Sequence, residues 1–115
     1  MLEIEVHEAV LGITVLKFSG RITMGPESAE AEVLVRKLLS ENRKKLVFDL
    51  TGVGYIDSTG LGTLVAAHCS AKTQGASLRL CHLGSKFQEL LQITKLVTVF
   101  DVYDTEAAAV ASFSN

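Results

Sequence analysis

The chain has 115 residues, 48% of them apolar, and a formal net charge of −2 with neutral histidines. This length suits one domain over residues 1–115, with enough apolar side chains for one core. The charge excludes the basic surface that direct nucleic-acid binding needs, and no apolar stretch approaches the roughly 20 residues of a membrane helix. The first residues lack the pattern of a secretory signal, so we expect a cytoplasmic protein without membrane insertion.

The N-terminal third predicts a hairpin, a loop and the start of a helix. Apolar and polar residues alternate over residues 2–7, which is the period of a half-exposed strand. A second strand is expected at residues 13–19, after a turn near residues 10–12. Residues 20–26 are expected to form a loop, and the proline that ends it suits the first turn of a helix.

The middle of the chain predicts two helices around a central strand. Apolar residues recur at helical spacing over residues 31–38, which gives that helix one buried face. The short apolar run at residues 46–50 is typical of a strand covered by helices on both faces. Apolar residues at Leu61, Leu64 and Val65 indicate a second helix, which is expected to end near Gly75.

The last third predicts two further strands and two further helices. A short strand is expected at residues 78–80, and residues 85–88 have the Ser-x-x-Gln pattern of a capping box at a helix start. Residues 97–102 predict a final strand. Asp104 is expected to cap an Ala-rich helix over residues 105–112.

Strands and helices therefore alternate after the opening hairpin. This order predicts an α/β fold with a mixed, mainly parallel sheet, an N-terminal β-hairpin and about four helices. No internal repeat or linker interrupts the pattern, so we expect these elements to form one compact unit.

Cysteine and histidine spacing argues against disulfides and metal binding. Cys69 and Cys81 lack the number and spacing of a disulfide framework, so we expect two reduced, buried thiols. Potential ligands adjoin only in the pairs His68–Cys69 and Cys81–His82, and adjacent residues on a helix or strand point apart. We therefore expect no metal site and no cofactor.

Catalytic motifs are also missing. The serine-hydrolase pattern Gly-x-Ser-x-Gly fails around Ser58 because Ile56 holds the first glycine position. Gly60 and Gly62 begin a dinucleotide-binding pattern, but Val65 stands at the third glycine position, and no Gly-Lys-Ser/Thr loop is present. The sequence therefore predicts a protein that is not an enzyme.

The most informative segment is Tyr55-Ile56-Asp57-Ser58-Thr59-Gly60-Leu61-Gly62, between an apolar strand and an amphipathic helix. A helix start carries partial positive charge and unpaired N–H groups, so a phosphate on Ser58 would fit there. The alternative, from the residues alone, is that Asp57 or Ser58 only caps the helix while Gly60 and Gly62 ease the turn.

With the strand before it, this segment closely resembles the STAS family, and specifically its bacterial anti-sigma factor antagonists. The family's Asp-Ser-(Ser/Thr)-Gly-Leu-Gly stretch after a central strand corresponds to residues 47–50 and 57–62. The likeness covers almost the whole chain, including residues 18–22, 87–91 and 99–103.

The resemblance implies a protein-binding switch. In that family the unmodified antagonist binds an anti-sigma factor serine kinase and so releases a sigma factor. The kinase phosphorylates the serine that matches Ser58, and a serine phosphatase reverses the modification. Thr59 is a candidate second acceptor, and Thr23 stands where many members carry an acid. The partner-binding residues implied are Thr23, Asp57, Ser58, Thr59, Gly60, Leu61 and Gly62.

The same fold leaves a second function open. A STAS scaffold or adaptor, in a stress-signalling assembly or a lipid-transport complex, would not need phosphorylation. The Asp57-Ser58 pair with a free neighbouring face favours the switch. We expect a monomer or a weak dimer, since an exposed first strand can pair with another chain.

Overall fold

The computed structural model describes residues 2–23, 26–95 and 99–114, and is built on a five-stranded sheet. Its strands lie side by side in chain order: β1 (Leu2–Glu8), β2 (Thr14–Ile22), β3 (Lys45–Ile56), β4 (Ser77–Cys81) and β5 (Asp101–Tyr103). The first pair is antiparallel and the other three pairs are parallel. The predicted mixed sheet with an N-terminal hairpin is therefore confirmed.

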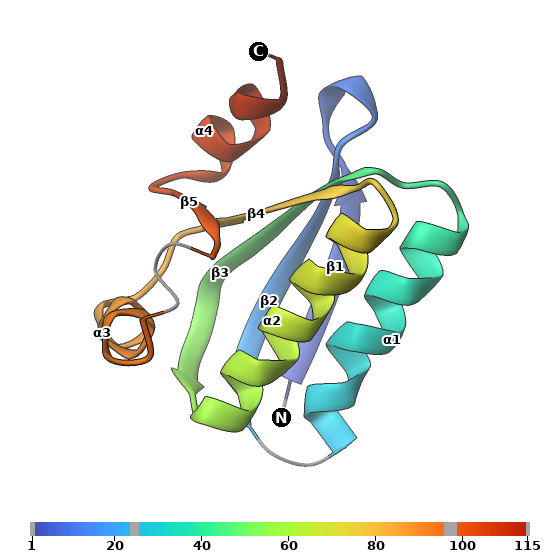
Figure 1. Ribbon diagram of the computed structural model, residues 1–115. Coiled ribbons are helices and arrows are strands. Elements are labelled where there is room, and N and C mark those ends of the chain that lie inside the picture. Colours follow the sequence, from blue (N-terminus) through green and yellow to red (C-terminus); the bar gives the residue numbers. More distant parts are fainter. Residues whose placement is uncertain (1, 24–25, 96–98, 115) are drawn as a thin grey trace.

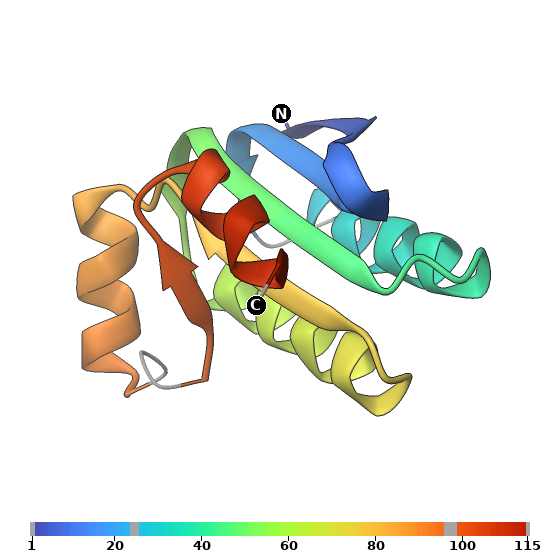
Figure 2. The ribbon, with the colours of Figure 1, turned by 90° about the horizontal axis from the view of Figure 1, so that it is seen from above.

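Helices cover both faces of this sheet. They are α1 (Pro26–Ser40), α2 (Ser58–Thr73), α3 (Ser85–Ile93) and α4 (Glu106–Ala111), with short 3-10 turns at Val10–Gly12 and Ser112–Ser114. α1 and α2 lie side by side on one face, and α4 lies on the opposite face (Figures 1 and 2). α3 lies toward the β5 edge of the sheet (Figure 2). No helix in the described part of the chain is long and apolar enough to cross a membrane.

The sheet separates two apolar clusters. The larger one lies beneath α1, α2 and α3, and there the rings of Phe18 and Phe48 pack with centroids 4.8 Å apart. The smaller one lies beneath α4 and consists of Ile13, Val15, Val47, Cys81 and Ala109. Every residue of the predicted central strand, 46–50, is buried. This strand is therefore covered on both faces, as its unbroken apolar run predicts.

Two strands extend further than predicted. β2 continues to Ile22, so the expectation of a loop at residues 20–26 is wrong for its first three residues. β3 continues beyond residue 50 to Ile56. After two shifts of register, Arg21 pairs with Tyr55 and Ile22 with Ile56. These extensions are half-exposed and rich in glycine and polar residues, which hides the strand pattern and leaves the pairing to long-range contacts.

Two predicted helix caps are wrong. Gly84, rather than Ser85, precedes α3 and makes no side-chain cap, and the Gln88 side chain donates instead to the Leu83 carbonyl at 3.2 Å. At α4, Thr105 replaces Asp104 as the cap, with its Oγ1 accepting from the Ala108 N–H at 3.0 Å. Hydroxyl and carboxyl side chains are similarly favourable helix caps, so an error of one residue in the predicted cap is expected.

The end of α2 agrees with the prediction. The helix stops at Thr73, and Gly75 takes a left-handed conformation with φ +77°. The Ala76 N–H then donates to the Ala71 carbonyl at 2.8 Å, and the Gly75 N–H donates to the Lys72 carbonyl at 3.1 Å. These two bonds form a Schellman motif, in which glycine avoids the steric cost of the left-handed turn.

Two further expectations need correction. Cys81 is buried as expected, but Cys69 is exposed on α2, because the inward face of this helix runs through Leu64, Ala67 and Ala71. The final strand covers only Asp101–Tyr103 instead of 97–102. Residues 97 and 98 lie outside the described part of the chain, and 99–100 form a turn and a bend.

The lowered pKa of His68 makes the free energy of unfolding depend on pH. His68 is half-buried on α2, with its ring 5.3 Å from that of Phe100. Burial, followed by the charge of Lys72, lowers the pKa of His68 from 6.5, while Asp101 opposes the shift. The unfolded chain therefore binds this proton more readily, and stability present above pH 6.5 is lost as the pH falls.

In urea unfolding, wild type should lose more free energy of unfolding than His68→Gln between about pH 7.5 and 5.5. The remaining histidines are common to both chains, so they cancel in the comparison. An equal loss in both proteins would contradict this assignment.

Candidate functional site

The segment singled out in the sequence joins the end of β3 to the first turn of α2 (Figure 1). Asp57 caps the helix: its Oδ1 accepts from the Gly60 N–H at 2.7 Å, and its carbonyl accepts from the Leu61 N–H at 2.9 Å. The capping alternative is thus confirmed for Asp57. Ser58 is then the first helical residue. A cap at Asp57 leaves the hydroxyl of Ser58 available for another role.

The start of α2 is pressed against the end of β2. The Asp57 N–H donates to the Ile22 carbonyl at 3.3 Å. A Cβ on Gly60 would lie 2.0 Å from the same carbonyl oxygen, which is far inside contact distance. Only glycine lets the helix begin here. The contact also brings Thr23, the residue after Ile22, to the same end of the molecule as Asp57 and Ser58.

Exposure divides the predicted surface residues into two groups. Ser58, Thr59 and Gly62 are exposed, and Thr23 and Asp57 are half-buried. Gly60 and Leu61, by contrast, are buried, and Leu61 is only 2% exposed. We correct the predicted contact surface accordingly: these two residues fix the helix to the core, and the outward surface belongs to the others.

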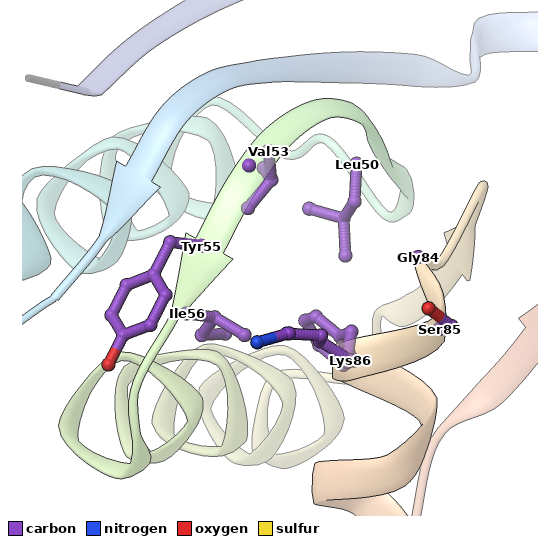
Figure 3. A pocket seen from close by; sticks show the side chains of 9 residues that line it. Leu50, Val53, Tyr55, Ile56, Gly84, Ser85 and Lys86 are labelled. Carbon is purple, nitrogen blue, oxygen red and sulfur yellow. The ribbon is translucent and has the colours of Figure 1, made fainter.

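Two features missed from the sequence adjoin this segment. The Arg21 guanidinium lies over the Tyr55 ring, 5.1 Å from its centroid. A groove of ≈ 200 Å³ is lined by Leu50, residues 53–56 and residues 84–87, and the Lys86 side chain reaches across it toward Ile56 (Figure 3). The groove ends two residues before Ser58. No local pattern connects residues 53–56 with 84–87, because only the fold brings α3 beside β3.

Potential metal ligands converge at one place, contrary to the expectation from their spacing. Cys81 and His82 are adjacent, yet the structure brings their ligand atoms together with a carboxylate oxygen of Asp49, all within 4.8 Å of one another. His82 has a left-handed backbone conformation with φ +57°, which breaks the strand alternation assumed in the sequence analysis. This cluster lies beneath α4, on the opposite face of the sheet from α1 and α2.

Comparison with known proteins agrees with this geometry. The family model described as "STAS domain" matches residues 2–109. The chain belongs to the STAS family. An anti-sigma-B factor antagonist of Bacillus subtilis (strain 168) is 40% identical to it over 74 residues, which cover 63% of this chain and 68% of that protein.

Solved structures extend the likeness of fold to the whole chain. An anti-sigma factor antagonist from Mycobacterium paratuberculosis matches with a TM-score of 0.84 at 22% identity, covering 100% of this chain and 96% of that one. The Bacillus cell fate determinant SpoIIAA in its phosphorylated form matches with a TM-score of 0.74 at 11% identity, covering 96% and 99%. The α/β architecture of this chain is therefore that of STAS domains.

Two glycines of α2 give a matched test of how this site is held. Gly60→Ala should destabilise the fold by about 2–3 kcal/mol, because its Cβ has to displace the Ile22 backbone. Gly62→Ala meets nothing within 4 Å and should stabilise the helix by about 0.5–1 kcal/mol.

The free energy of unfolding in urea measures both changes. Effects of the same sign and size in the two variants would show that α2 does not rest on Ile22 as described.

Proposed function

We propose that this STAS domain is an anti-sigma factor antagonist, which binds an anti-sigma factor serine kinase and releases a sigma factor until Ser58 is phosphorylated. The observation that carries the proposal is the exposed Ser58 hydroxyl at the start of α2, beside the capping carboxylate of Asp57. The names of the similar proteins support it, since the Bacillus subtilis relative is an anti-sigma-B factor antagonist. A serine phosphatase would restore the binding form.

The binding surface is proposed to centre on the exposed start of α2. Its members are Thr23, Asp57, Ser58, Thr59 and Gly62. The Arg21–Tyr55 stack and the groove beside Lys86 extend it along the end of β3. Hydroxyls, a carboxylate and an exposed aromatic ring form the mixed polar and apolar surface that suits a partner that binds reversibly.

Charge explains how phosphorylation would end binding. A phosphate adds about −1.5 to −2 charges and three strong acceptors at one point. Within the free protein this group is favourably placed, because the helix start is partly positive and solvent reaches Ser58. A partner packed on the same surface would have to desolvate a dianion next to Asp57. A loss of about 3 kcal/mol there weakens binding more than a hundredfold.

The fold itself has no reason to change. The backbone around Ser58 is held by the Asp57 cap and by the close contact of Gly60 with Ile22. The Ser58 hydroxyl takes part in neither of these interactions. Thr59 is also exposed and is proposed as a second acceptor. We therefore propose that the kinase distinguishes the two forms at the surface, and that the protein acts in the cytoplasm without catalysing a reaction itself.

The test compares tagged wild type, Ser58→Ala and Ser58→Glu as baits in lysate of the native host, with mass spectrometry of the captured proteins. Wild type and Ser58→Ala should capture a small ATP-binding serine kinase, and Ser58→Glu should lose it by at least tenfold. Gln74→Glu is the matched control, because it adds one negative charge at the exposed far end of α2 and should bind like wild type.

Capture of the same partners by all four baits would contradict the switch. If those partners were other STAS proteins or membrane transport subunits, the scaffold function would replace it.

A further inference from the structure

Four side chains of metal-ligating type meet on the sheet face opposite α1 and α2. Asp49 of β3 and Cys81 of β4 are register partners, so their side chains lie next to each other on this face. His82 follows Cys81 directly, and Glu106 begins α4 above them. A carboxylate oxygen of Asp49, the Cys81 Sγ and a ring nitrogen of His82 all lie within 4.8 Å of one another.

The backbone at His82 makes this convergence possible. Successive residues of a strand point to opposite faces, which would turn His82 away from Cys81. His82 instead adopts φ +57°, a conformation that residues with a side chain rarely take. Its Nε2 accepts a long hydrogen bond from the Glu106 N–H at 3.3 Å. The imidazole is thereby held between the end of β4 and the start of α4.

The cluster contains two acidic side chains, Asp49 and Glu106, that line one hollow. Asp49 is 5% exposed, and its Oδ1 accepts from the Thr51 N–H at 3.0 Å and from the Thr51 hydroxyl at 2.5 Å. Asp49 and Glu106 line the same hollow as His82. The Glu106 Oε1 is buried and has no hydrogen-bond partner among the described residues. Two carboxylates beside one hollow repel each other, and a cation bound between them would relieve that repulsion.

Ionisable side chains of β1 and β2 also face the cluster. His7 of β1 approaches the Glu106 Oε2 at 3.7 Å, and Lys17 of β2 lines the same hollow of ≈ 550 Å³. Burial, followed by the charges of Asp49 and Glu106, raises the pKa of the Cys81 thiol to about 12, and Lys17 opposes this. The same two carboxylates that disfavour a bare thiolate would stabilise a metal ion bound to it.

We propose that Asp49, Cys81 and His82, with Glu106 as the fourth ligand, form a zinc-binding site. A set of sulfur, nitrogen and carboxylate oxygen donors is typical of Zn²⁺, which binds four such ligands tetrahedrally. With bond lengths of about 2.0–2.3 Å, ligand atoms around zinc lie roughly 3.5 Å apart. The ligand atoms of Asp49, Cys81 and His82, which lie within 4.8 Å of one another, therefore have to approach by little more than about 1 Å.

In the proposed binding step, the protein releases one proton, from Cys81, and loses one hydrogen bond, from the Glu106 N–H to His82. Zn²⁺ takes the lone pair of His82 Nε2 in place of the weak bond from the Glu106 N–H, and Nδ1 keeps its hydrogen. A Zn–S bond forms as the Cys81 thiol releases its proton to solvent. The metal would thereby link β3, the end of β4 and α4. The metal ligands lie on the opposite face of the sheet from α2, which carries Ser58, so neither proposal depends on the other (Figure 2).

Titration of the metal-free full chain with Co²⁺ tests this site, because thiolate-bound cobalt has a charge-transfer absorption that other ligands do not give. Wild type should bind one Co²⁺ with this absorption, and Zn²⁺ should displace it. Cys81→Ser should lose the absorption, and His82→Asn should weaken binding at least tenfold. Asparagine is chosen to replace His82 because it tolerates a left-handed backbone conformation.

Cys69→Ser is the matched control, since Cys69 is the exposed cysteine of α2 and should not contribute. Circular dichroism confirms that each variant is folded, and His82→Asn keeps the test valid if Cys81→Ser unfolds. The proposal is overturned if wild type shows no thiolate absorption with excess Co²⁺. It is equally overturned if Cys69→Ser abolishes the absorption or if His82→Asn binds like wild type.

Discussion

The contact between the first turn of α2 and the end of β2 is the constraint on which the candidate site depends. The Ile22 carbonyl accepts from the Asp57 N–H and lies where a side chain on Gly60 would have to be. Leu61, one residue later, is buried in the core. With Asp57 capping the helix, the backbone on both sides of Ser58 is determined by contacts that do not involve the serine hydroxyl. That hydroxyl is consequently exposed and available.

A helix start that is held without the Ser58 hydroxyl suits a protein whose binding is controlled by surface charge. A group added to Ser58 would change the surface that a partner contacts, and it would leave the Asp57 cap and the contact of Gly60 with Ile22 in place. The opposite sheet face has its own polar cluster beneath α4, where a metal would act on the C-terminal helix instead of on the partner surface.

Sequence patterns predicted the fold well because strand and helix periods are local. The buried run at 46–50, the stop of α2 near Gly75 and the helix start at Asp57 all depend on neighbouring residues. What they missed depends on distant ones. The tails of β2 and β3 form because Arg21 and Tyr55 pair across strands, and the groove by Lys86 forms because α3 reaches β3. The metal-type cluster was missed because the argument assumed regular strand geometry at His82, where φ is +57°.

The most direct test of this account is the ¹H–¹⁵N spectrum of the chain with phosphoserine installed at position 58, compared with that of the unmodified chain. If the switch is read at the surface, the changes should be confined to the start of α2 and its neighbours at the ends of β2 and β3, around Asp57, Ile22 and Tyr55. Amides of the central strand at 46–50 should keep their positions. Widespread changes through that strand would show that phosphorylation refolds the core, and would contradict a switch read at the surface.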